Sequence, residues 1–310
     1  MEYDRTAALK IEAEPQFGCS ELVLERFRIG KRLCEGASGT VYMAVDCRSG
    51  DVVAVKMTML PRELESGERQ TLVRRFFSSA RTSIRLKHPH IVSILQAGVA
   101  EDRAYLVMEY LSGRDLRFCI NPDRLLPLRD VLSIVAKIAE ALAYAHRSGV
   151  VHCDVKPANI MYSGGCDTVK ITDFGIARSM DSFGQGRETL QGTPYYMAPE
   201  QLAGDRIDGR ADLFSLGVVL YQLCCGRLPF QADTRAHLVF KIAHEPHVDI
   251  RSHDPTLSGP VAEIIDKSLA KRPGLRYRTG DEMARDLRKC IAGSVPSARV
   301  HPHDFMETHG

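Results

Sequence analysis

Apolar residues in the first third of the chain stand in short, valine-rich runs, a pattern that is typical of strands. We expect strands within residues 28–44 and 51–57, followed by two shorter ones at 91–95 and 104–108. Between them, residues 68–87 have the pattern of a helix, which the following His-Pro pair ends. This part of the chain is therefore predicted to form a sheet accompanied by one helix.

Beyond Gly113 the spacing of apolar residues becomes that of helices. The first of these helices follows the i, i+3, i+4, i+7 rule at Val131, Ile134, Val135, Ile138 and Leu142, and Gly149 ends it. Short strands are expected near Ile160 and at 169–171, and helices at 211–224, 233–243, 260–269 and 280–291. The pattern predicts an α+β fold with a small β-rich part and a larger, mainly helical part.

The composition limits the class of protein but does not indicate which reaction it catalyses. The 310 residues carry 41 basic and 39 acidic side chains, a net charge of +2, so nothing favours nucleic acid as a partner. The longest apolar stretch, between Asp212 and Gln222, is far short of the ~20 residues of a membrane span. The nine cysteines are odd in number and show no CxxC spacing, which favours reduced thiols and a cytoplasmic protein. The first residues lack the apolar run of a signal peptide.

A polar cluster interrupts the apolar pattern in the middle of the chain. It reads His-Cys-Asp-Val-Lys-Pro-Ala-Asn over residues 152–159, and Asp173-Phe174-Gly175 follows after a short strand. Two carboxylates, an amide and a lysine are the groups that phosphoryl transfer requires, because they can accept a proton, hold magnesium and neutralise phosphate. A polar loop with chance spacing is the alternative interpretation.

With these motifs the chain resembles a protein kinase of the eukaryotic-like Ser/Thr type found in bacteria, over about residues 27–291. The resemblance implies a bilobal kinase fold, with lobes at about 25–109 and 113–292 of a domain spanning 25–292. Residues 1–24 and 293–310 are then expected to be tails.

The resemblance also implies roles for the polar cluster. Asp154 matches the catalytic base that accepts the proton of a substrate hydroxyl, and Lys156 matches the lysine that stabilises the transferred phosphoryl group. Asn159 and Asp173 match the ligands of Mg²⁺, with Mn²⁺ as an alternative metal.

An ATP site is implied by three further segments. Residues 33–41 match the glycine-rich loop, Val53-Ala54-Val55-Lys56 matches the strand with the ATP-binding lysine, and Met108-Glu109-Tyr110-Leu111 matches the hinge. Without this context, a simple hairpin and a strand-end lysine are the alternative interpretations. The implied nucleotide contacts are Leu33, Cys34, Glu35, Gly36, Ala37, Ser38, Gly39, Thr40, Val41, Ala54, Lys56, Glu109, Leu111, Asp115 and Met161.

Three positions depart from the kinase pattern. Cys34 replaces the first glycine of the loop, and Cys153 replaces the arginine that precedes the catalytic aspartate. Ser79 stands where the helix glutamate that pairs with Lys56 is expected, and Glu68 lies about three helical turns earlier. The loss of that pair predicts a rate about ten- to a hundredfold lower, if the pair acts by positioning.

Residues 173–200 have the length of an activation segment and end in Ala198-Pro199-Glu200. Ser179, Ser182 and Thr189 are candidate phosphorylation sites, and Thr193 matches a residue that bridges Asp154 and Lys156. The resemblance further implies that Glu200 pairs with Arg276 and that Asp212 anchors the catalytic loop.

Three functions are therefore weighed. The first is an active kinase that transfers the γ-phosphoryl group of ATP to Ser or Thr hydroxyls of proteins and also phosphorylates itself. The second is a pseudokinase, favoured by the three departures but opposed by the retained Lys56, Asp154, Asn159 and Asp173. The third, a small-molecule phosphotransferase, is disfavoured by the long activation segment. Substrate and oligomeric state stay open.

Overall fold

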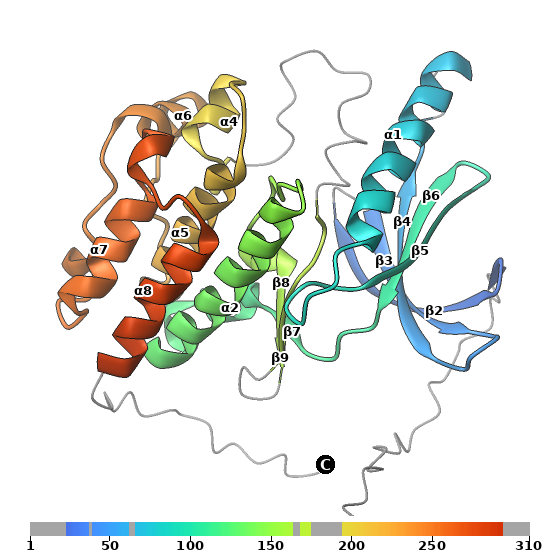
Figure 1. Ribbon diagram of the computed structural model, residues 1–310, viewed down its shortest axis with the longest axis horizontal. Helices are drawn as coiled ribbons and strands as arrows, with labels where there is room; N and C mark the ends of the chain where they lie inside the picture. The colour runs from blue at the N-terminus through green and yellow to red at the C-terminus, as the bar shows by residue number, and fades with distance from the viewer. Residues whose placement is uncertain (1–22, 37–38, 62–65, 164–167, 175–193, 294–310) are drawn as a thin grey trace, which may run out of the picture.

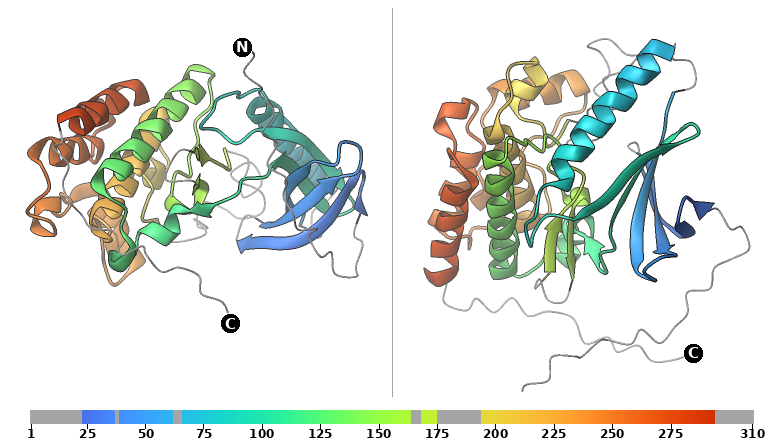
Figure 2. Two further views of the ribbon diagram at one scale, coloured as in Figure 1. Left: turned by 90° about the horizontal axis from the view of Figure 1, so that it is seen from below. Right: turned by 45° about the vertical axis from the view of Figure 1, so that its right-hand side comes forward.

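A strand-rich lobe and a mainly helical lobe lie side by side in the computed structural model of the chain (Figure 1). The structure describes residues 23–36, 39–61, 66–163, 168–174 and 194–293. Figure 2 shows that the helices of the larger lobe are grouped on one side and the main sheet on the other. The α+β class predicted from the apolar pattern is confirmed.

The smaller lobe is built on a six-stranded antiparallel sheet in the order β1-β2-β3-β4-β6-β5. Side chains alternate between the two faces of a strand, so Ala54 and Lys56 share one face while Val53 and Val55 share the other. The face of Ala54 packs against the helix of this lobe that the structure describes, whereas Val53 and Val55 belong to a separate core with residues of β2 and β3. The strands are β1 (Val23–Leu24), β2 (Phe27–Gly36), β3 (Gly39–Asp46), β4 (Val52–Met59), β5 (Ile94–Ala100) and β6 (Arg103–Glu109).

Helix α1 (Ser66–Ile84) covers that face of the sheet. Leu72, Phe76 and Ala80 recur every four residues, are at most 2% exposed, and pack in one cluster with Ala54 and Met108. The helix ends before the expected residue 87, because Arg85 and Leu86 continue as tight turns that bond to Thr82 and Ser83.

The larger lobe is organised around α2 (Leu128–Arg147) and α5 (Gly209–Cys225). The side chains of α5 from residue 211 to residue 224 are buried, as expected of a helix surrounded by others. Helix α8 lies against α2 because Gly280 has no side chain: a Cβ there would be 2.0 Å from the carbonyl oxygen of Ala139. The remaining helices are α4 (Pro199–Ala203), α6 (Arg235–His244), α7 (Gly259–Ser268) and α8 (Gly280–Gly293).

A second, three-stranded sheet lies where the lobes meet. Its strands are β7 (Arg114–Asp115), β8 (Ile160–Ser163) and β9 (Thr168–Ile171). Ile171 exchanges backbone hydrogen bonds with the stretch before β5, since its amide donates to His90 and its carbonyl accepts from Val92. This small sheet therefore fixes the segment that follows Asp154 and the segment that precedes Asp173 relative to the first lobe.

The strand predicted at 91–95 differs from the structure. β5 spans Ile94–Ala100, and Ile91 contributes only an isolated bridge to Ile171. Neither buried residue lies in a strand of the main sheet: Ile91 packs in the core of the larger lobe with Ile171, and Val92 packs in the cluster between α1 and the main sheet. Within the described residues, none of the helices has the length and apolar character needed to cross a membrane.

Candidate active site

Asp154 lies in a loop between α2 and β8, and two side chains from the same loop contact it. Lys156 Nζ is 2.7 Å from Asp154 Oδ2, and Asn159 Nδ2 donates to the same oxygen at 3.0 Å. Asn159 also donates to the Asp154 carbonyl at 2.8 Å, across the short 3₁₀ turn Pro157–Asn159. The carboxylate is 40% exposed, so it is held in place and still accessible to a substrate.

Buried Asp212 on α5 anchors this loop from behind. Its side chain, 1% exposed, accepts from the backbone amides of His152 at 2.8 Å and Cys153 at 2.7 Å, and lies 2.8 Å from His146 Nε2. Gln201 donates to the carbonyl of Cys153, whose φ is 66°, an uncommon angle for a side-chain-bearing residue. The anchoring role expected of Asp212 is confirmed, and it holds a strained loop in place.

Lys56 pairs with Asp173. Lys56 Nζ is 2.9 Å from Asp173 Oδ1, with the two side chains 8% and 25% exposed. Asp173 directly follows the segment fixed by β9 and has a φ of 65°. Ser79 carries no acid and is half-buried on α1, so a carboxylate of the second lobe takes the place of a helix glutamate.

The segments of Asp154 and Asp173 are joined directly. The Thr172 amide donates to the Asn159 carbonyl at 2.8 Å, and His152 Nε2 lies 2.8 Å from the Thr172 carbonyl. The Phe174 ring packs on His152 with a centroid distance of 4.6 Å. Asn159 and Asp173 therefore come from adjacent, mutually bonded segments.

The metal-ligand types fit Mg²⁺, a hard cation that prefers oxygen. Asn159 uses its amide nitrogen on Asp154, which leaves its amide oxygen available to a metal ion. Among the described residues there is no group of three His, Cys, Asp or Glu side chains suited to a metal. A carboxylate and an amide are sufficient where phosphate oxygens complete the shell.

The glycine-rich segment forms the hairpin between β2 and β3. Gly39 has a φ of 123°, and a Cβ there would lie 2.3 Å from the Met57 carbonyl, so only glycine fits. Leu33, Cys34, Glu35 and Gly36 are exposed on β2, and Thr40 and Val41 lie half-buried on β3. Ala37 and Ser38 lie outside the described residues.

The resemblance implies that Val41, Ala54 and Met161 form the apolar walls around adenine. Val41 and Ala54 belong to one apolar cluster with Met108 and Leu111, and Met161 lies half-buried on β8 opposite Asp115. The Glu109 carboxylate accepts from the Ser93 amide at 2.7 Å and from Lys170 Nζ at 2.6 Å. Because Lys170 lies on β9, this ion pair joins the end of the main sheet to the second lobe.

Asp115 has a partner that the sequence did not suggest. Arg117 donates to both oxygens of its carboxylate, at 2.9 Å and 2.8 Å, and this bond raises the pKa of the guanidinium. A ribose contact at Asp115 would therefore share the carboxylate with Arg117.

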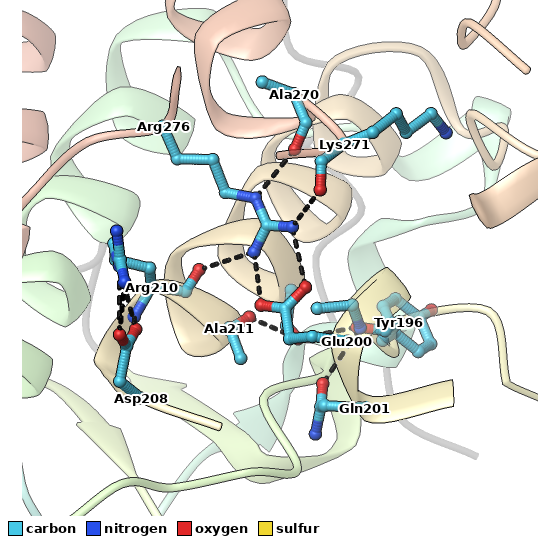
Figure 3. Close-up of polar contacts among 11 residues, drawn as sticks. Tyr196, Glu200, Gln201, Asp208, Arg210, Ala211, Ala270, Lys271 and Arg276 are labelled. Carbon is cyan, nitrogen blue, oxygen red and sulfur yellow. Dashed lines mark hydrogen bonds and ion pairs between the residues drawn. The ribbon is translucent and has the colours of Figure 1, made fainter. Parts of the chain in front are cut away.

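The ion pair expected between Glu200 and Arg276 is confirmed (Figure 3). The guanidinium donates to both Glu200 oxygens, at 2.6 Å and 2.8 Å, and to the carbonyls of Arg210, Ala270 and Lys271. All its nitrogens are bonded, and its side chain is 0% exposed. The candidate phosphorylation sites Ser179, Ser182 and Thr189, together with Thr193, lie outside the described residues.

Comparison with known proteins agrees with this geometry. The protein kinase domain profile matches residues 27–301. The chain belongs to the protein kinase family. It is 35% identical over 280 residues to the serine/threonine-protein kinase PknB of Mycobacterium leprae, covering 88% of this chain and 44% of the relative. It is 36% identical over 265 residues to a probable serine/threonine-protein kinase, CPE1738, of Clostridium perfringens, covering 85% and 38%.

A crystal structure of Rad53 residues 1–466 in complex with AMP-PNP has the same kinase fold. The TM-score is 0.70 at 27% sequence identity, covering 84% of this chain and 64% of that chain. The expected bilobal kinase fold is thereby confirmed. The chain spans less than half the length of the two bacterial relatives.

The sequence motifs missed three residues that contact the site: His146 on Asp212, Lys170 on Glu109 and Arg117 on Asp115. His146 and Lys170 are more than 60 residues from their partners in the sequence. Only Arg117 had a local signal, because it lies two residues from a carboxylate at the start of a 3₁₀ turn.

Proposed function

We propose that this chain is a protein serine/threonine kinase that transfers the γ-phosphoryl group of ATP to Ser or Thr hydroxyls of proteins, itself included. The supporting observation is that Lys56 pairs with Asp173, that Lys156 and Asn159 both contact Asp154, and that a backbone hydrogen bond from Thr172 to Asn159 joins the two segments. The names of the bacterial relatives and the nucleotide analogue bound to Rad53 support the same assignment.

In this proposal each side chain has a separate task. Asp154 accepts the hydroxyl proton, and Lys156, 2.7 Å away, offsets negative charge on the transferred group. Asn159 and Asp173 hold Mg²⁺, which neutralises charge on the phosphates when it is bound. Lys56 binds the phosphates from β4, while the hairpin of Gly36 and Gly39 brings backbone amides over them.

We further assign the nucleotide contacts to Leu33 through Val41, Ala54, Glu109, Leu111, Asp115 and Met161, and the kinase domain to residues 25–292. The seven cysteines in the described ranges form no disulfide, which supports a cytoplasmic site of action. A protein with accessible Ser or Thr is the expected partner.

The test is phosphoamino-acid analysis after incubation with labelled ATP and Mg²⁺ or Mn²⁺ and a general protein substrate. Wild type should place label on Ser and Thr, and Asp154→Ala and Lys56→Ala should not. Label that persists in Asp154→Ala would remove the assignment of the base. Absence of label in every sample, with ATP still raising the melting temperature, would support the pseudokinase, for which the missing acid at Ser79 is the specific argument.

A further inference from the structure

A positively charged pocket lies on the side of α1 that faces away from the sheet. Arg74, Arg81 and Arg85 line it. Arg74 and Arg81 are seven residues apart on α1 and, at 100° per residue, project within about 20° of each other, while Arg85 lies in the turn that follows the helix. The pocket has a volume of about 580 Å³. Its other lining residues are Val73, Phe77, Ser78, Thr82, Leu86 and Ser148.

The charge of this pocket is not balanced by its own walls. No Asp or Glu is among the described residues that line it, and within the described ranges none of the three arginines has an ion pair. Other exposed arginines of the protein are paired, such as Arg69 with Asp102 and Arg147 with Asp281. Three guanidiniums left on one face repel one another, a cost that an anionic ligand would relieve.

The donors available to a ligand are mainly guanidinium groups. The Thr82 hydroxyl donates to the Ser78 carbonyl, and the Ser148 hydroxyl donates to the Tyr144 carbonyl, so these protons are already used. Guanidinium presents a planar pair of N–H groups that matches phosphate oxygens better than a single ammonium does. A phosphoserine side chain carries about two negative charges and three strong acceptors.

Apolar surface beside the arginines favours a peptide over a free anion. Phe77 is 37% exposed although it is a large aromatic residue, and Val73 and Leu86 line the pocket beside it. A phosphate ion would leave this surface in water, whereas a residue next to phosphoserine would cover it. The volume is within the range of pockets that bind ligands larger than one ion.

We propose that this pocket docks a phosphorylated Ser or Thr segment of a partner protein, with Arg74, Arg81 and Arg85 on the phosphate and Phe77 on a neighbouring apolar side chain. Binding there uses none of the residues assigned to phosphoryl transfer. The proposal can therefore be tested, and can fail, independently of catalysis.

The test is a fluorescence anisotropy titration of the full chain, without ATP, using a short labelled peptide with one phosphoserine between leucines in an alanine background. The same peptide with serine or glutamate in that position is the comparison. We expect the phosphopeptide to bind at least about tenfold more tightly than either, a difference of ~1.4 kcal/mol. Equal affinity for all three peptides would overturn the proposal, and a glutamate peptide as tight as the phosphopeptide would overturn the phosphate specificity.

Variants locate the binding site. The double variant Arg81→Gln with Arg85→Gln should weaken phosphopeptide binding at least about tenfold. The double variant Arg81→Lys with Arg85→Lys should weaken it less, because lysine keeps the charge but lacks the planar pair of donors. Arg129→Gln, an exposed arginine on α2, is the matched control and should bind as wild type. Undiminished binding in the double glutamine variant would place the peptide elsewhere, and inorganic phosphate that competes as well as the phosphopeptide would show that the pocket takes a free anion.

Discussion

Lys56 on β4 and Asp173 after β9 form an ion pair of 2.9 Å that joins the two lobes. Asp173 therefore faces two cations in the proposed kinase, the lysine and a metal. In the kinase pattern a helix glutamate holds the lysine, but Ser79 leaves that position without charge. The pairing restrains Lys56, but the lysine and the metal then compete for the Asp173 carboxylate.

Ser79→Glu tests this competition. A carboxylate on α1 should draw Lys56 away from Asp173, raise the rate about tenfold and lower the Mg²⁺ concentration needed for half-maximal rate. The measurement is initial rate against Mg²⁺ concentration. Ser78→Glu, which adds the same charge one position along the helix, is the control. An unchanged Mg²⁺ dependence in Ser79→Glu would show that Lys56 does not compete with the metal.

Asp212→Asn should reduce turnover without unfolding the protein. The amide cannot accept from His152, Cys153 and His146 together, so the loop that carries Asp154 loses part of its anchor. We expect kcat to fall about ten- to a hundredfold with little change in the KM for ATP. Asp208→Asn, at the start of the same helix, should keep wild-type kcat. An equal loss in both variants would argue for a general effect on α5.

The buried pair of Glu200 and Arg276 should stabilise the fold only as a pair. Arg276→Met leaves a buried carboxylate without a partner and should lower the free energy of unfolding by about 3–5 kcal/mol. Adding Glu200→Leu to that variant should restore much of the loss, since no buried charge then remains. Urea unfolding gives both values. A double variant less stable than Arg276→Met would contradict this account.

Lys271 should make stability depend on pH. Burial, followed by the charge of Arg276, lowers the pKa of this lysine to about 8, while its ammonium donates to the Lys241 and Ile242 carbonyls. Between about pH 8 and 10.5 the unfolded chain then holds more protons at this site than the folded chain, so this contribution to stability increases as pH rises. The side chain is half-buried, so we expect about 1 kcal/mol over this window after allowing for solvent screening.

The measurement is the difference in unfolding free energy between wild type and Lys271→Met at about pH 8 and about pH 9.5. Taking the difference cancels the titration of tyrosine and cysteine side chains, whose pKa values burial raises. The unfolding free energy of wild type minus that of Lys271→Met should increase with pH. A difference that decreases with pH would mean that the fold stabilises the charged form of Lys271.

Much of the site could be predicted because its motifs resemble those of protein kinases. Asp154, Lys156 and Asn159 stand in one such motif, and a single loop brings them together. The partner of Lys56 could not be predicted, because the pair depends on how the second lobe presents Asp173 to β4. The same holds for Lys170 on Glu109 and for the position of β5, where Ile91 is buried by β9 and not by the main sheet. The sequence pattern indicates which face of a helix or strand is apolar, but it does not indicate which other element packs against that face.

The most direct test of the account is the rate of γ-phosphoryl transfer from ATP to protein Ser and Thr by wild type and by Asp154→Asn. The substitution keeps the shape of the side chain and removes its capacity to accept a proton. We predict measurable transfer by wild type and a loss of at least about a hundredfold in kcat, since general base catalysis contributes about 10²–10⁴-fold. Equal rates for the two proteins would contradict the assignment of Asp154 as the catalytic base.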